Sequence, residues 1–196
     1  MRTNRLEAFS DGVLAIIITV MVLELHVPEQ HDWAALGDSA TGFLTYALSF
    51  VYVGIYWNNH HHMFQVVERV SGAVLWANLH LLFWLSLFPF TTGWMDESGF
   101  ATVPTIVYGV DLLLAGTAYY LVQLVVFRLP GGEHLREAVG ADFKGKSSPV
   151  FYIVGILLCL VNTYLGLAVY TVVALMWLIP DKRMERYVEA HEVASG

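Results

Sequence analysis

Six long apolar runs divide the chain, and their lengths constrain its fold more than any other feature. A helix needs about 20 residues to cross the ~30 Å hydrocarbon core of a bilayer, because it rises about 1.5 Å per residue. The runs are too long for strands and lack the alternation of a membrane barrel. We therefore predict an all-α integral membrane protein with six transmembrane helices, over about residues 6–27, 42–60, 72–94, 101–127, 150–164 and 167–179.

The last two runs are short for transmembrane helices and lie close together in the sequence. We expect a tight hairpin around residues 162–166 to connect them. The whole chain, 1–196, then forms a single six-helix domain with a short polar tail over residues 180–196.

The composition indicates a chain that is surrounded by lipid. Hydrophobic residues make up 57% of the chain and charged residues only 14%, whereas soluble domains contain about 25% charged residues. The net charge of −7 and the lack of a basic stripe argue against a nucleic-acid partner. The single cysteine, Cys159, lies in an apolar run, so we expect a small buried side chain and no intrachain disulfide.

The positive charges predict how the chain is oriented in the membrane. All ten basic residues fall on one side of a six-helix topology: Arg2, Arg5, Arg69, Arg128, Arg136, Lys144, Lys146, Lys182, Arg183 and Arg186. The opposite connections carry acidic residues, which are Glu29, Asp32, Asp38, Asp96 and Glu97. Because Lys and Arg are enriched in cytoplasmic loops, both termini are predicted to be cytoplasmic.

Familiar catalytic patterns are absent from the sequence, including HExxH, GxSxG and a phosphate-binding glycine loop. We therefore expect no enzymatic activity and no cofactor. The feature most similar to a metal site is the run of His60, His61 and His62 at the end of the second predicted helix. Adjacent helical residues point about 100° apart, so these three cannot converge on one ion without other partners. We favour an interfacial polar cluster, with a metal site as the alternative.

Asp111 lies near the middle of the fourth predicted helix. Ionisable residues inside a membrane usually face protein or water and mark functional positions. One interpretation is a structural hydrogen bond to a neighbouring helix, through a Tyr or an Asn. The other is a protonatable group in an ion path, and both remain open. A proton channel or proton-coupled transporter that uses Asp111 with His60, His61 and His62 is therefore an alternative function.

The start of the first apolar run contains Arg5, Ser10 and Asp11. In one account Ser10 or Asp11 caps a helix that begins after them, which leaves a short span. In the other account the helix begins earlier, and all three side chains lie inside the bundle at its cytoplasmic end. Each would then need partners from other helices, and His60 lies at the same depth.

An aliphatic stripe continues along the same run. Ile16, Val20 and Leu23 follow each other at helical spacing, with Thr19 beside them. By itself such a stripe is typical of a core or of a lipid-facing surface. The Thr19 hydroxyl adds little, because it can bond to the backbone one turn earlier.

These residues resemble those of a known family, the potassium-permeable channels named for the endosomal and lysosomal transmembrane protein 175. Arg5, Phe9, Ser10 and Asp11 match its R-x-x-x-F-S-D signature on the first helix. Trp57, His60 and Phe64 match W-x-x-H-x-x-x-F at the end of the second, and the third resembles the family's third helix through Asn78 and Pro89. The match covers the first three predicted helices, whereas the last three agree in hydropathy alone.

The resemblance implies a prokaryotic, single-repeat, potassium-selective channel. Such a chain is expected to form a homotetramer in the plasma membrane and to conduct K⁺ and other monovalent cations passively, with lipid around it. Helix 1 of each subunit lines the pore on the oligomer axis, and no metal other than permeating K⁺ is required. Laid on the family's helix 1, Ile16 falls at the constriction, Thr19 at a polar position, and Val20 and Leu23 at apolar layers. The motif and gating network comprises Arg5, Phe9, Ser10, Asp11, Trp57 and His60. Its polar anchor, which guides gating, is the region of Arg5, Ser10 and Asp11 with His60.

Overall fold

Antiparallel helices account for most of the residues that the computed structural model describes, which are 3–178 without 66, 68, 131, 133–135, 137–139 and 141. The expected tail over residues 180–196 lies outside this part of the chain. The helices are α1 (Thr3–Leu23), α2 (Trp33–Asp38), α3 (Ala40–Gln65), α4 (Gly72–Leu85), α5 (Phe88–Glu97), α6 (Thr102–Val126), α8 (Phe143–Cys159) and α9 (Thr163–Leu178).

Four helical stretches in the described part are long and apolar enough to cross a membrane. They are Thr3–Leu23, Trp33–Gln65, Gly72–Glu97 and Thr102–Val126. The helix α9 is apolar but shorter, and α8 contains 17 residues. The prediction of an all-α protein with long apolar helices is confirmed, whereas the crossing of the membrane by all six segments stays a prediction.

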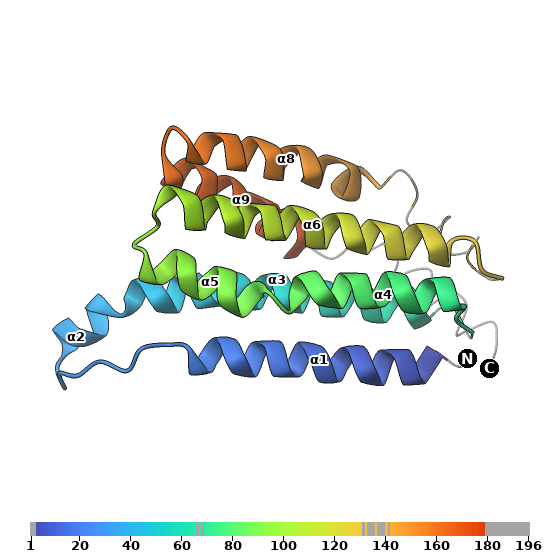
Figure 1. Ribbon diagram of the computed structural model, residues 1–196, viewed down its shortest axis with the longest axis horizontal. Helices are drawn as coiled ribbons and strands as arrows, with labels where there is room; N and C mark the ends of the chain where they lie inside the picture. The colour runs from blue at the N-terminus through green and yellow to red at the C-terminus, as the bar shows by residue number, and fades with distance from the viewer. Residues whose placement is uncertain are drawn as a thin grey trace.

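The third predicted helix is two helices, α4 and α5, with Ser86 and Leu87 between them. Pro89 lies in the first turn of α5. A proline has no backbone N–H and clashes with the carbonyl four residues earlier, so the hydrogen-bond ladder stops at this point. The two helices nevertheless follow one another along the bundle, as Figure 1 shows.

The hairpin between the last two helices lies earlier than expected. The helix α8 ends at Cys159 and α9 begins at Thr163, so the turn occupies residues 160–162 rather than 162–166. The helix α8 also begins at Phe143 rather than at residue 150, because Asp142 caps it by accepting a hydrogen bond from the Gly145 N–H at 3.0 Å.

The helices form a bundle in which α1 lies at one edge (Figure 1). It packs on α3, α4 and α5. The helix α6 lies between that group and the α8–α9 pair at the opposite edge, and it contacts α4, α5, α8 and α9. Its inward side chains are therefore fully covered: Tyr108, Leu112, Ala115, Ala118 and Val122.

Small residues let α8 and α9 approach closely. A Cβ atom on Gly166 would lie 2.8 Å from the carbonyl oxygen of Gly155 and would also meet Cys159. Glycine at such a crossing is the usual way for membrane helices to pack, because lipid supplies no hydrophobic drive for their association. Cys159 is buried and free, as expected from its apolar surroundings.

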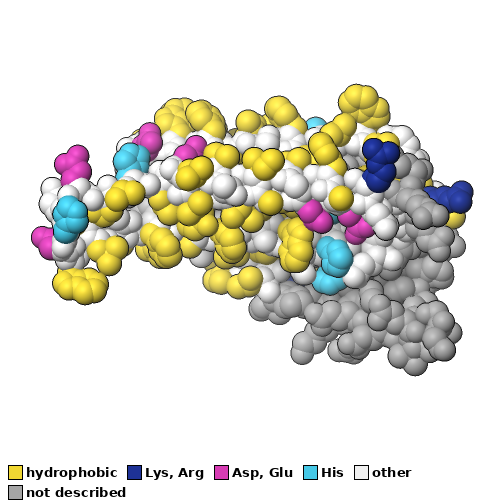
Figure 2. Space-filling model, turned by 90° about the horizontal axis from the view of Figure 1, so that it is seen from below, with side chains coloured by type: hydrophobic (Ala, Val, Ile, Leu, Met, Phe, Trp, Pro, Cys, Tyr) yellow, Lys and Arg dark blue, Asp and Glu magenta, His cyan; other side chains and the backbone are white. Residues whose placement is uncertain are grey.

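Charged side chains are unevenly distributed over the face in Figure 2. Lys and Arg side chains lie at one end, whereas Asp and Glu side chains also occur at the opposite end. Of the ten basic residues, Arg2, Lys182, Arg183 and Arg186 lie outside the described part of the chain. The distribution agrees with the loop pattern in the sequence, but the direction of the bundle in a membrane stays a prediction.

Candidate functional site

The helix α1 has two different faces. Leu6, Ser10, Leu14, Ile17 and Met21 recur at spacings of three and four residues, and all are buried against the bundle. The opposite face is uncovered within one chain. There Ile16, Val20 and Leu23 are 64%, 37% and 77% exposed, and Thr19 is exposed beside them. The four residues that the family resemblance assigns to the pore therefore share the outer face, and they do not belong to the core.

Two motif residues extend this outer face toward the start of α1. Arg5 and Phe9 precede Ile16 at helical spacing, and both are exposed. Within the described residues, Arg5 has no acidic partner within 4 Å. The face thus begins with a guanidinium group that no acidic side chain of the described part neutralises, and it continues as an apolar strip.

The Thr19 hydroxyl donates its hydrogen to the backbone carbonyl of Ala15 at 2.8 Å. This bond to the preceding turn is the local one that the sequence allows. Its oxygen keeps lone pairs on the outer side of α1, so it can still accept a hydrogen bond or approach a cation.

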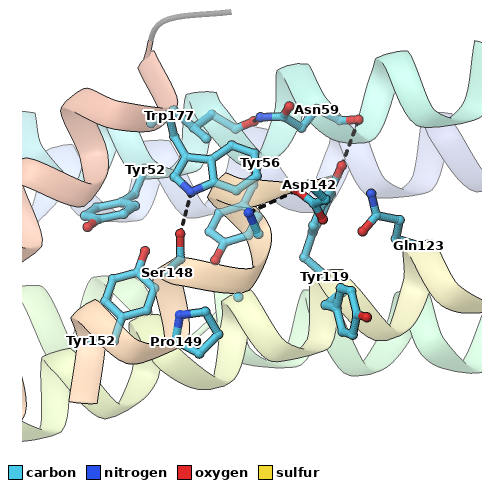
Figure 3. A pocket seen from close by; sticks show the side chains of 14 residues that line it. Tyr52, Tyr56, Asn59, Tyr119, Gln123, Asp142, Ser148, Pro149, Tyr152 and Trp177 are labelled. Atoms are coloured by element: carbon cyan, nitrogen blue, oxygen red, sulfur yellow. Dashed lines mark hydrogen bonds between the residues drawn. The ribbon is translucent and has the colours of Figure 1, made fainter. Parts of the chain in front are cut away.

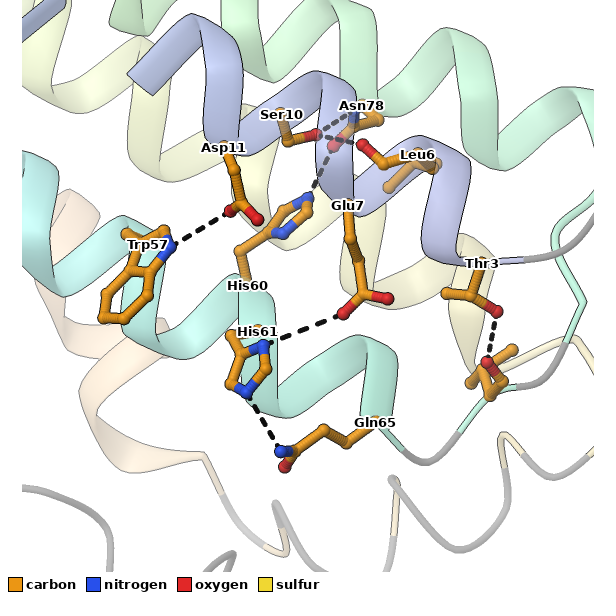
Figure 4. A network of polar contacts seen from close by, with 11 residues as sticks. Thr3, Leu6, Glu7, Ser10, Asp11, Trp57, His60, His61, Gln65 and Asn78 are labelled. Atoms are coloured by element: carbon orange, nitrogen blue, oxygen red, sulfur yellow. Dashed lines mark hydrogen bonds and ion pairs between the residues drawn. The ribbon is translucent and has the colours of Figure 1, made fainter. Parts of the chain in front are cut away.

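A buried chain of hydrogen bonds ties α1 to α3 and α4 (Figure 4). Asn78 donates from its side-chain nitrogen to Ser10 Oγ at 3.0 Å, and Ser10 donates to the Leu6 carbonyl at 2.9 Å. The Asn78 oxygen can only accept, so His60 Nε2, at 2.8 Å, must carry a hydrogen and donate it. All the hydrogens therefore point in one direction, from α3 through α4 to the backbone of α1.

A second set of contacts joins α1 to α3 nearer the surface. Trp57 donates from its indole nitrogen to Asp11 Oδ1 at 3.0 Å. His61 Nδ1 lies 3.7 Å from Glu7 Oε1, and its ring stacks on Trp57 with centroids 6.1 Å apart. Figure 4 shows both contacts on the side of the buried chain that faces away from Asn78. Together with the bond from Thr3 to the Val67 carbonyl, they hold the first part of α1.

Neither account of the opening stretch holds in full. The helix begins at Thr3, so Ser10 and Asp11 lie inside it and cap nothing. Ser10 is fully buried, as the second account expected, but Arg5 and Asp11 are exposed. A six-residue separation places Arg5 and Asp11 on different faces, and the bundle covers only the Ser10 side.

The adjacent side chains of His60 and His61 diverge. His60 points inward to Asn78, whereas His61 lies outside beside Glu7. Among the described residues, no group of three His, Cys, Asp or Glu side chains could hold a metal ion. The arrangement is therefore that of polar contacts at the end of α3.

Asp111 belongs to another network than His60. Its Oδ2 atom lies 3.0 Å from Thr91 Oγ1 on α5, within hydrogen-bond distance. The partner is a threonine rather than the Tyr or Asn that the sequence suggested. The alternative that combined Asp111 with the histidines therefore has no direct contact to support it in the described residues.

A small cavity lies inside the bundle, between α3, α6, α8 and α9 (Figure 3). Its volume is about 50 Å³, and a water molecule needs roughly 10–15 Å³ of such space. The lining is aromatic and polar, and includes Tyr56, Tyr119, Asp142, Tyr152 and Trp177. No lining residue comes from α1, and a space for a few waters does not form a pore through the chain.

The far end of α1 is acidic and lacks the polar bonds of the first part. Glu24 follows Leu23, and partial burial together with the nearby carboxylate of Glu97 raises the pKa of Glu24. In the described residues, the polar contacts from α1 to other helices all come from residues between Thr3 and Asp11.

The sequence did not predict two sets of contacts that hold the first part of α1. Asn78 was noted only as a family motif position, yet it joins Ser10 to His60. An amide within an apolar run is itself a signal, because it must find hydrogen-bond partners inside the bundle. The pairing of Glu7 with His61 had no such signal, since both lie at helix ends where water could serve them.

The chain is similar to several known proteins. Residues 5–89 match the family model described as Endosomal/lysosomal potassium channel TMEM175. A potassium channel of Chryseobacterium sp. (strain P1-3) is 53% identical over 187 residues, which are 95% of this chain and 97% of that relative. A potassium channel of Streptomyces collinus is 39% identical over 99 residues, which are 48% of each chain.

The fold is similar to a solved structure. The crystal structure of a lysosomal potassium-selective channel TMEM175 homolog from Chamaesiphon minutus matches with a TM-score of 0.78 and 29% sequence identity. The match covers 91% of this chain and 97% of that one.

Replacing Ser10 tests the buried network. Ser10→Ala removes the acceptor of the Asn78 amide and leaves a buried donor unsatisfied, so the free energy of unfolding should fall by about 1–3 kcal/mol. Thermal or denaturant unfolding of the purified protein in detergent measures the change. Thr19→Val is the matched control, because it removes a hydroxyl of α1 that bonds only to its own helix. Equal losses in the two variants would contradict a role of Asn78 in holding α1.

Proposed function

The chain belongs to the family of the endosomal/lysosomal potassium channel TMEM175, and we propose that it is a passive, potassium-selective channel of the plasma membrane. The observation that carries this function is the 53% identity, over nearly the full length of both chains, to a bacterial protein named as a potassium channel. The family membership expected from the R-x-x-x-F-S-D motif is thereby confirmed. The family is one of ion channels rather than a class of enzymes.

The pore in this proposal is lined by α1 from several copies of the chain. The helix lies at the edge of the bundle and leaves one face uncovered, so equivalent faces can meet on a symmetry axis. The internal cavity offers no competing path, since it holds only a few waters and is lined by other helices. Four copies are the expected number for a single-repeat member of this family.

Ile16 forms the constriction. Four branched side chains around an axis make a ring that excludes water when closed, and such hydrophobic constrictions gate by dewetting. Thr19, Val20 and Leu23 form the next layers toward the far end of α1. Potassium loses its water more readily than sodium, so partial dehydration past these apolar walls favours K⁺, and the lone pairs of Thr19 compensate for part of the loss.

The contacts near the start of α1 guide its motion. Ser10, Asp11 and Glu7 hold this part to α3 and α4, whereas the part from Ile17 onward packs through apolar side chains. Apolar contacts are not directional, so they permit sliding and rotation more readily than a set of hydrogen bonds. Opening therefore moves the far half of α1 about its fixed start.

Arg5 needs a partner in the assembled channel. It lies on the same face as Ile16, where four unpaired guanidinium groups would repel entering cations. Asp11 is exposed on its own chain, so an acidic side chain of an adjacent copy can neutralise Arg5. In this arrangement the R-x-x-x-F-S-D motif makes contacts between subunits as well as contacts between the helices of one chain.

The topology follows the positive-inside rule. Both termini, with Arg5 and the connections that carry Arg69 and Arg128, lie on the cytoplasmic side, and all six apolar segments cross the membrane. Proton conduction through Asp111 remains an alternative function, and proton flux without potassium that Asp111→Asn abolishes would favour it.

Reconstitution in liposomes tests the function directly. Opposed gradients of potassium and sodium should give a reversal potential close to that of potassium, because the pore discriminates by dehydration. Empty liposomes are the control. A potential that does not respond to potassium would contradict the proposal.

Replacing Ile16 tests the constriction. Ile16→Asn places four amides where the closed ring excludes water, so basal potassium flux should rise several-fold and discrimination against sodium should fall. Val22→Asn is the matched control, since Val22 is also exposed on α1 but lies on another side of the helix. If Ile16→Asn leaves flux and selectivity unchanged, the constriction lies elsewhere.

A native mass measurement in mild detergent tests the assembly. A pore lined by α1 requires several chains around one axis, and we expect the mass of four chains with bound lipid. A stable monomer that still conducts would contradict a pore between subunits.

A further inference from the structure

A carboxyl group in the middle of the bundle is only half satisfied by its neighbours. Asp111 lies on α6 and is 3% exposed. Its Oδ2 atom lies 3.0 Å from Thr91 Oγ1, whereas Oδ1 is buried without a hydrogen-bond partner in the described residues. Buried carboxylates normally accept bonds at both oxygens, so this group calls for an explanation.

The surroundings of Asp111 in the described part of the chain contain little that could compensate a negative charge. Within the described part of the chain, no basic side chain lies within 4 Å of its carboxyl group. The ionisable groups that face it are the phenols of Tyr56 on α3 and Tyr108 on α6. The Tyr108 hydroxyl is engaged with Ser49 at 3.0 Å, and Ser49 also bonds to Thr92 at 2.7 Å. The Tyr108, Ser49 and Thr92 hydroxyls satisfy one another, and no described hydrogen bond joins Tyr56 to Asp111, which leaves Asp111 to Thr91.

Thr91 has one hydrogen and three acceptors within reach. Its oxygen lies 3.2 Å from the Leu87 carbonyl, 3.4 Å from the Phe88 carbonyl and 3.0 Å from Asp111 Oδ2. If Asp111 were ionised, this single hydrogen would be the only one available to two carboxylate oxygens in an apolar site. If Asp111 is a neutral acid, it donates to Thr91, and Thr91 donates to a backbone carbonyl. The second arrangement satisfies more groups and buries no unpaired charge.

We propose that Asp111 is a proton-binding site, in which a neutral carboxyl group donates its hydrogen to Thr91 and Thr91 donates its own to the Leu87 or Phe88 carbonyl. The ligand is a proton. Its release leaves a carboxylate, and the Thr91 hydrogen then turns from the backbone to Oδ2. No other group gains or loses a proton in this step.

The site lies where a change of hydrogen bonds has a structural effect. Thr91 is in the first turn of α5, directly after the break at Ser86 and Leu87, and α5 packs on α1. Loss of the proton therefore weakens the first turn of α5 and places a charge beside it. This link to α1 rests on the proposed channel function, whereas the proton site itself does not.

Infrared spectroscopy of the protein in lipid tests the site without any flux. A protonated carboxylic acid gives a carbonyl band above the amide I band, and the wild-type protein should show it at neutral pH. The band should be lost in Asp111→Asn and retained in Asp96→Asn, the matched control at the end of α5, where Asp96 is only partly buried. A wild-type protein without the band, or a band that survives Asp111→Asn, would overturn the site.

A second variant keeps the test valid if Asp111→Asn fails to fold. Thr91→Val preserves the shape of the side chain but removes the acceptor of the acid. The band should then move to higher frequency, because the carbonyl bond of a carboxyl group stiffens when its O–H group no longer donates a hydrogen bond. An unmoved band would overturn the assignment of Thr91 as the acceptor.

Potassium flux tests the link to α1 separately. The loss of the infrared band with rising pH has a midpoint, where half of the protein has released the Asp111 proton. As pH rises through this midpoint, the wild-type potassium flux should change at least two-fold. The flux through Asp111→Asn should stay constant over the same pH interval. If Asp111→Asn follows pH as the wild type does, the link to the pore is overturned while the infrared result on the site stands.

Discussion

The hydrogen bond from Asn78 to Ser10 fixes the rotation of α1, and the rest of the functional geometry depends on that rotation. Turning α1 by one residue, about 100°, would take Ser10 out of the bundle and bring the outer face with Ile16 toward it. Apolar packing alone would resist this turn weakly, because both sides of the helix beyond Asp11 are aliphatic. The amide and the hydroxyl remove the ambiguity, because neither can be left unpaired away from water.

The same rule accounts for the polar interior of the bundle. Hydroxyl groups on α3, α5 and α6 bond to one another or to the preceding turn of their own helix, as Ser49 and Thr92 do. Lipid contains no water that could bond to an unpaired donor, so each polar side chain needs a hydrogen-bond partner on a neighbouring helix or on its own backbone. Asp111 is the exception among the described residues, because its Oδ1 atom is buried without a hydrogen-bond partner. It is also the position where an added proton removes a buried charge and supplies a hydrogen to donate.

Much of the fold could be predicted from the sequence, because the thickness of a membrane fixes the length of a helix in advance. Apolar runs therefore located the helices, and Pro89 and Asp142 carry local signals for the break before α5 and the early start of α8. The pairing of helices could not be predicted in this way. Which threonine meets Asp111, or which amide meets Ser10, depends on the rotation and depth of two helices that are distant in sequence. The outer face of α1 was correctly grouped by spacing, but only the bundle shows that no part of the same chain covers it.

The uneven attachment of α1 gives it the mechanics of a lever. From Asp11 to Leu23 the helix is about 18 Å long, at about 1.5 Å per residue. A swing of about 10° at the attached end then displaces Leu23 by about 3 Å over that length, roughly the diameter of a water molecule. A rearrangement of side chains too small to disturb the fold is thus magnified along a rigid rod, so in the proposed pore residues far from the constriction are effective places for control.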